Sequence, residues 1–388
     1  MRRPDIAFAR DARGAVACAF AWALTLVGWL ALGALGRATT PLWFDGLAPL
    51  ACWLAASVAF SARPACRGAR DPDDHVVTLA AGLVAAGGLV WAARSGSAIG
   101  AFVAATAWAA MSGAAWRAAR PVPDATSSHR ATRMAWTTIA PAIAGAALAW
   151  AIAGDLDGGM PIAIAARVAL FVLTCSVLLP SLSRPRIDDV AAQDCVATIV
   201  VSSETRRADP WAVAAARWTM LPMMAAMVVA GDWCASGNFT AHAAMALHFA
   251  AMFVPALLAT LPGGAARPLC GSAVIATLMI AGVAASLAWP GARGWLAMSL
   301  LHAAAWSLAW AQTLHGEAIA RAPTRASTAP HAAIAALPAV AVLALGALLS
   351  RFGIAGLVAV HIGLGVVSAA GAIAWALRAV RPLEEMHS

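Results

Sequence analysis

The stretch GAVACAFAWALTLVGWLALGALG, residues 14–36, decides the fold class of this chain. It carries no charged residue, and it is longer than the roughly 20 apolar residues that a helix needs to cross the ~30 Å hydrocarbon layer of a bilayer. Only helices and closed barrels satisfy their backbone hydrogen bonds in lipid. Barrel strands alternate apolar and polar residues over about ten positions, which this stretch does not do. We therefore predict a membrane-spanning helix.

Blocks of the same kind recur along the chain, which has 388 residues, 62% of them hydrophobic and only 11% charged. Soluble domains carry about 25% charged residues. The sequence predicts an all-α, polytopic membrane protein with about twelve transmembrane helices in two six-helix halves. The predicted spans are 14–36, 47–62, 75–93, 97–116, 135–154, 161–183, 211–230, 240–262, 268–289, 294–313, 331–350 and 353–377.

The arginines support this map and give it an orientation. All 26 basic residues are arginine, and 20 of them fall on one side if the N-terminus is cytoplasmic. Short cytoplasmic loops are enriched in basic residues, so we expect both termini to be cytoplasmic and the protein to lie in the cell inner membrane. The arginines are spread over many loops and form no stripe, which argues against nucleic acid as a partner.

The longest polar interruption is RPRIDDVAAQDCVATIVVSSETRRADP, residues 184–210. Loops of this length are often linkers or functional segments. We predict a cytoplasmic central loop here, between an N-terminal transmembrane half at 1–183 and a C-terminal half at 211–388. No repeat between the halves is visible in the sequence itself.

Twelve helices in under 400 residues, split six and six with both ends inside, resemble the major facilitator superfamily of secondary transporters. The resemblance lies in topology. The loop after the second predicted helix, SARPACRGARDPDD at 61–74, has the charge character of that family's signature loop but lacks its pattern. The resemblance implies alternating access, with a substrate site between the halves near the middle of the membrane.

Two short motifs resemble a copper-importing branch of that superfamily. Predicted helix seven carries Met223-x-x-x-Met227 and predicted helix eight carries His248-x-x-x-Met252. Thioether and imidazole ligands suit Cu(I), and neighbouring side chains would extend the set on the same helix faces. The candidate metal residues are Met223, Met227, His248, Met252, Met245 and His242. The competing interpretation is that methionine fills gaps in apolar packing.

Four further residues are candidates for substrate binding: His302, Trp306, Arg217 and His361. Ionisable side chains inside a membrane are functional candidates by default. Arg217 can instead reach the headgroups from a helix end, and a neutral histidine can bond a neighbouring carbonyl. No Asp or Glu falls in the middle of a predicted span, so either a histidine carries any transported proton or transport is not coupled to protons.

No motif of a hydrolase, a nucleotide-binding enzyme or a metalloprotease is present, and we expect no enzymatic activity. The sequence favours an inner-membrane secondary transporter for a small solute or a soft metal ion, with copper as the metal to test. Cu(I) would be substrate or ligand, and no other cofactor is expected. The alternative is a membrane-embedded metal- or haem-binding protein, or an assembly or sensor subunit that transports nothing.

Overall fold

The computed structural model describes residues 4–39, 43–62, 72–119, 135–153, 162–182, 241–260, 272–289 and 291–317, together with Met220, Met224 and single positions between 340 and 373. Within these residues the chain is helical and contains no strand. The helices are α1 (Pro4–Thr39), α2 (Trp43–Ala62), α3 (Pro72–Ser95), α4 (Ala98–Ala119), the π-helix η1 (Ala135–Ile139), α6 (Ala140–Ala153), α7 (Ile162–Leu182), α11 (Ala241–Thr260), α12 (Ser272–Ala288) and α13 (Ala292–Glu317).

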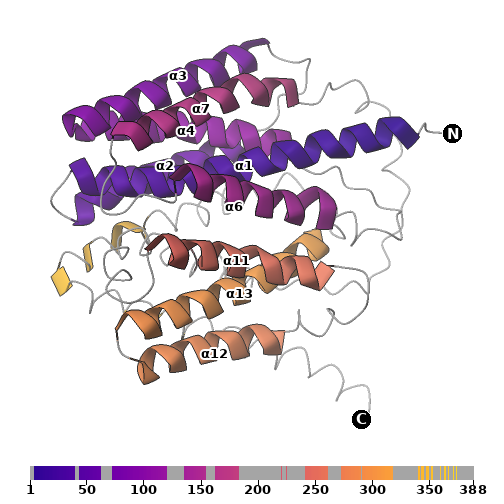
Figure 1. Cartoon of the computed structure of the whole chain (residues 1–388), viewed down its shortest axis with the longest axis vertical. Coiled ribbons are helices and arrows are strands. Elements are labelled where there is room, and N and C mark those ends of the chain that lie inside the picture. Colours follow the sequence, from indigo (N-terminus) through magenta and orange to yellow (C-terminus); the bar gives the residue numbers. More distant parts are fainter. Residues whose placement is uncertain are drawn as a thin grey trace.

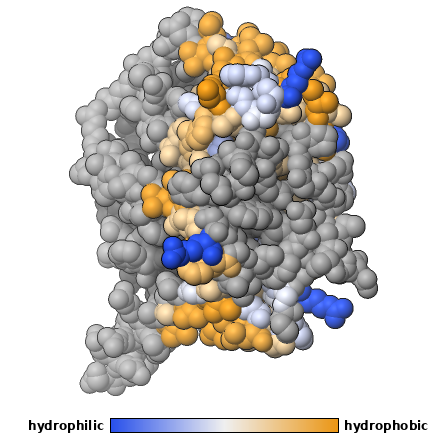
Figure 2. Space-filling view, turned by 90° about the vertical axis from the view of Figure 1, so that its left-hand side faces the viewer, coloured by the Kyte–Doolittle hydropathy of each residue, from blue (hydrophilic) through white to orange (hydrophobic). Residues whose placement is uncertain are grey.

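The all-α, polytopic membrane fold is confirmed. Each predicted span that falls on described residues coincides with a helix, and η1 with α6 together form the span predicted at 135–154. In the described residues, six helices are long and apolar enough to cross a membrane. Exposed side chains on these helices are largely apolar, among them Leu83 and Leu170. Figure 2 shows such residues over the described part of one face, interrupted by isolated hydrophilic ones.

The described helices form two groups, α1 to α7 and α11 to α13 (Figure 1). In the first group α2 and α3 both pack on α4, and in the second α11 and α12 both pack on α13. The same pairing thus occurs twice, although no repeat is visible in the sequence. The two groups lie within the predicted halves. The boundary loop at 184–210 lies outside the described residues, so the division at that loop remains a prediction.

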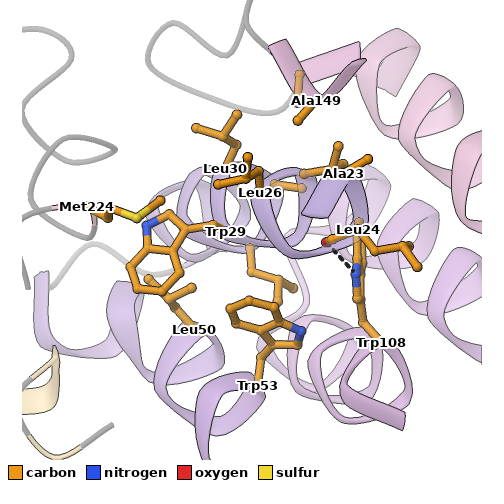
Figure 3. Close-up of a cluster of buried hydrophobic side chains, with 14 of the residues drawn as sticks. Ala23, Leu24, Leu26, Trp29, Leu30, Leu50, Trp53, Trp108, Ala149 and Met224 are labelled. Atoms are coloured by element: carbon orange, nitrogen blue, oxygen red, sulfur yellow. Dashed lines mark hydrogen bonds between the residues drawn. The ribbon is translucent and has the colours of Figure 1, made fainter. Parts of the chain in front are cut away.

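The core of the first group is built around α1. Trp29 of α1, Trp53 of α2 and Trp108 of α4 are each at most 2% exposed, and Trp53 and Trp108 lie beside α1 in this core (Figure 3). The indole Nε1–H of Trp108 donates to the carbonyl oxygen of Leu24 at 3.1 Å. A buried indole usually finds such a partner, and this bond fixes α4 against α1.

The π-helix was not predicted from the sequence, although its cause is local. Pro141 follows η1 and has no backbone N–H, so the helix cannot close its ordinary bond to the carbonyl one turn earlier. Widening to a π turn accommodates such a break. In the widened segment the thiol of Cys18 on α1 donates to the carbonyl oxygen of Thr138 at 3.7 Å. The irregular turn is therefore tied to α1.

Candidate functional site

An aromatic cluster lies where α1 and α4 approach α11 and α13. It joins the two helix groups, and its centre is Trp22 on α1. The ring centroid of Trp22 lies 4.9 Å from that of Phe253 on α11 and 5.4 Å from that of Trp310 on α13. The full cluster is Trp22, Trp116, Phe253, Trp306 and Trp310.

The rings adopt the geometries that aromatic electrostatics favour. Trp22 meets its neighbours edge to face, with interplanar angles between 74° and 86°. Trp306 and Trp310 are stacked, 5.6 Å apart and 16° from parallel. They are four residues apart and so share one face of α13. Each such pair contributes about 0.5–1.5 kcal/mol beyond the area it buries, so the cluster is a sizeable contact between the groups.

Two neighbours on its own side of the molecule position Trp22. Gly145 of α6 lies so close to α1 that an added β-carbon would be 2.5 Å from the carbonyl oxygen of Ala19 and 2.8 Å from the Trp22 β-carbon. On α4, the indole N–H of Trp116 donates to Thr25 Oγ1 at 3.1 Å. The indole N–H of Trp22 itself is buried and has no hydrogen-bond partner among the described residues.

On the other side of the cluster, two hydrogen bonds fasten α11 to α13. Ser299 Oγ lies 2.9 Å from His248 Nδ1, and the backbone N–H of Ala256 donates to Ser307 Oγ, also at 2.9 Å. Both bonds join residues 51 positions apart, so the two helices run parallel and in constant register between them. Phe253 and Trp306 lie between these bonds in sequence, and the paired helices therefore hold both rings as one unit.

Several predicted site residues lie in this region. Trp306 belongs to the cluster, and His302, one turn before it on α13, is 2% exposed. His248 is fully buried, and its Nε2 has no hydrogen-bond partner among the described residues. Met252 follows one turn later on α11 and is 1% exposed, and Met245 is half-buried. Of the predicted residues, Trp306 contacts the first group through Trp22, and His302 lies one turn before it on α13.

Other predicted site residues lie outside the described residues: Arg217, His361, Met223 and Met227. His242 lies within α11, but the description does not extend to its side chain. That the candidate metal residues of predicted helices seven and eight lie close enough to bind one ion therefore stays a prediction. The described methionines Met220, Met224 and Met252 are buried in the hydrophobic core, as the packing interpretation expects. Among the described residues no group of three His, Cys, Asp or Glu could hold a metal.

Four cluster residues were not among the predicted candidates: Trp22, Trp116, Phe253 and Trp310. The chain has 17 tryptophans, and nothing in their linear order says which of them meet. The spacing of Trp306 and Trp310 was the one local signal, since residues four apart in a helix share a face.

Comparison with known proteins identifies the fold. The nucleoside transporter NupG superposes with a TM-score of 0.58 at 13% sequence identity, over 94% of this chain and 98% of that one. An auto-inhibited peptide transporter of the POT family superposes with a TM-score of 0.54, again at 13% identity, over 96% and 97% of the two chains. No family model and no curated protein sequence matches this chain. The resemblance to transporters of the major facilitator type is confirmed at the level of the fold.

Proposed function

We propose that this chain is a secondary transporter of the cell inner membrane, which moves a small solute by alternating access of its two helix groups. The observation that carries the proposal is the aromatic cluster, which joins α1 and α4 to α11 and α13 in a chain with a transporter fold. Alternating access requires one repeat to rock or gate against the other around a fixed site. Contacts between the groups must then form and break in each cycle.

The cluster is suited to that role because its contacts are separate ring pairs of modest strength. The two sides of the cluster are held independently: Trp22 and Trp116 belong to the first group, while Phe253, Trp306 and Trp310 are carried by the fastened pair α11 and α13. In this proposal the solute binds at the junction, against Trp306, with His302 as the nearest predicted polar contact along α13. Arg217 and His361 remain predicted substrate contacts.

The test is uptake by the purified full-length protein in proteoliposomes. The panel of labelled solutes contains a nucleoside, a dipeptide and Cu(I), because the two similar structures are transporters of nucleosides and peptides and copper is the sequence-based candidate. We expect accumulation of at least one solute. Trp306→Ala removes contacts with Trp22, Phe253 and Trp310 and should lower uptake about tenfold, since 1.4 kcal/mol corresponds to a factor of ten.

The matched control is Trp91→Ala, because Trp91 on α3 is 48% exposed and lies outside the cluster. Its uptake should equal that of the parent. Equal loss in both variants would mean that Trp306 acts only through general stability. Absence of uptake for a broad panel would favour the alternative of an assembly or sensor subunit, and a visible absorption band in the purified protein would favour the haem-binding alternative.

A second candidate for the transported solute is a soft metal ion, and Cu(I) is the ion to test. Its support is local: Met252 follows His248 by one turn on α11, and the buried Nε2 of His248 has no hydrogen-bond partner among the described residues. A soft ion such as Cu(I) accepts both ligand types. The remaining candidate ligands are Met223, Met227, Met245 and His242.

A further inference from the structure

We propose that the solute recognised at the junction carries a planar, uncharged aromatic ring with a hydrogen-bond acceptor at its edge; this rests on the proposed function and names its substrate class. The geometry behind it is that of the aromatic cluster. Trp22 meets Phe253 and Trp310 edge to face, at interplanar angles of 80° and 74°. When the two groups separate, those rings lose their contact with Trp22. A planar aromatic solute that takes its place restores the same kind of contact, whereas a saturated ring does not.

The exposure of the rings agrees with replacement of Trp22 by a solute ring. Phe253 is 1% exposed and Trp306 is 8% exposed, so these two rings of the second group are enclosed by protein. Trp22, Trp116 and Trp310 are only half-buried, although they lie between packed helices. These three residues therefore keep some exposed surface in the present conformation. Ligand pockets are usually lined by aromatic side chains with a few polar groups, and this junction has that composition.

The polar groups at the junction specify the rest of the solute. The Trp22 indole N–H is a donor without a partner among the described residues, and an acceptor on the solute would satisfy it once Trp22 moves. Leaving a buried donor unpaired is unfavourable, so the solute's acceptor would add specificity. His302 lies one turn before Trp306 on α13 and is buried; in this proposal it lines the solute site. None of the buried side chains among the described residues belongs to Asp, Glu, Lys or Arg, which favours an uncharged ring.

The solute ring does not bind between the stacked rings of Trp306 and Trp310. The Trp306 and Trp310 centroids are 5.6 Å apart, which leaves no room for a third ring between them, since stacked or edge-on partners prefer separations of about 4.5–7 Å from each neighbour. The solute ring must therefore meet the pair from the side that Trp22 now occupies. This makes Trp22 a competitor of the solute and Trp306 a part of its binding surface.

The experiment uses the full-length protein in lipid nanodiscs and two matched pairs of probes. Uridine is compared with 5,6-dihydrouridine, and benzamide with cyclohexanecarboxamide; all four are uncharged, and in each pair the second member has lost the aromatic ring. Binding is measured by tryptophan fluorescence and by the midpoint of thermal unfolding. The planar member of at least one pair should bind about tenfold more tightly than its saturated partner, the effect of one to two lost ring contacts.

Variants separate this recognition from simple packing. Trp306→Leu should abolish the preference for the planar probe, and Trp22→Phe, which keeps a ring but removes the indole N–H donor, should weaken binding of that probe severalfold. Trp91→Leu, outside the cluster, should change neither. Equal binding of planar and saturated probes, or unchanged planar binding in Trp22→Phe, would overturn the proposal. Should a dipeptide or Cu(I) be transported while no planar probe binds, the substrate class is wrong but the transporter function stands. If a planar probe binds but no solute is taken up, the recognition of a planar ring stands and the transporter function is wrong.

Discussion

Trp22 on α1 and Phe253 on α11 lie edge to face, with centroids 4.9 Å apart and an interplanar angle of 80°. The two residues are far apart in the sequence and belong to different helix groups, so their contact reports directly on whether the groups are closed against each other. A pair of this kind contributes about 0.5–1.5 kcal/mol. An equilibrium between two conformations of similar free energy shifts severalfold when such a contact is lost.

The first prediction concerns this contact. Trp22→Leu should change the rate of solute exchange across proteoliposomes about fivefold or more, because it removes ring contacts between the groups. Trp53→Leu is the control: Trp53 pairs with Trp29 at 6.0 Å, and both lie within the first group. That variant should lower the unfolding temperature without a comparable change in exchange. Similar exchange rates in the two variants would show that the cluster is ordinary core.

A second prediction follows from the close approach of α6 to α1. Gly145→Ala places a β-carbon 2.5 Å from the carbonyl oxygen of Ala19, and overpacking of this kind costs about 1–3 kcal/mol. Gly87→Ala on α3 meets nothing within 4 Å and should be neutral or stabilising by up to about 1 kcal/mol, from helix propensity alone. Thermal unfolding in detergent measures both variants. Equal midpoints would mean that α6 moves away from α1 without cost.

The helices were predictable from the sequence, whereas the contacts between them were not. Hydropathy and arginine placement predicted the helices because a span depends only on its own composition and on the charges beside it. They could not predict that Trp22 meets Phe253, because that contact depends on packing between distant segments. Glycines such as Gly145, which determine how closely helices approach, also look alike in the sequence whether they face a neighbouring helix or lipid. The π turn at Ala135–Ile139 was likewise not predicted, because hydropathy is the same for a π-helix and an α-helix.

A third prediction tests how α11 is fastened to α13. Pro255 interrupts the hydrogen-bond ladder of α11 because it has no N–H, and the next N–H, that of Ala256, donates to Ser307 Oγ. Ser307→Ala removes this acceptor and should cost about 1 kcal/mol. Ser286→Ala is the control, since that hydroxyl bonds only locally to the carbonyl of Val283. Hydrogen exchange should accelerate around Ala256 in the first variant and not in the second. Unchanged exchange would show that α11 does not depend on this bond.

The fourth prediction concerns orientation. With the N-terminus cytoplasmic, residue 238 falls in an external turn and residue 200 in the cytoplasmic central loop. A reporter enzyme that is active only outside the cytoplasm should therefore work when it is fused after residue 238 and fail after residue 200, as the distribution of arginines requires. The reverse pattern would place an error in the map near predicted helix seven, although the helices of the described structure would be unaffected.

The last prediction separates copper from packing. In the copper hypothesis Met227 and Met252 supply sulfur ligands, and replacing both by Leu keeps volume and apolar character at a cost below about 1.5 kcal/mol. Met279→Leu is the control, because Met279 on α12 is buried like Met252, at 3% and 1% exposure respectively, and lies outside the motif. The double variant should insert and unfold like the control yet lose Cu(I) accumulation. Retention of copper in the double variant, or no copper bound by the parent, would leave these methionines as packing. Recognition of a planar solute involves neither side chain, so binding of the planar probes should be the same in both variants whichever way the copper result falls.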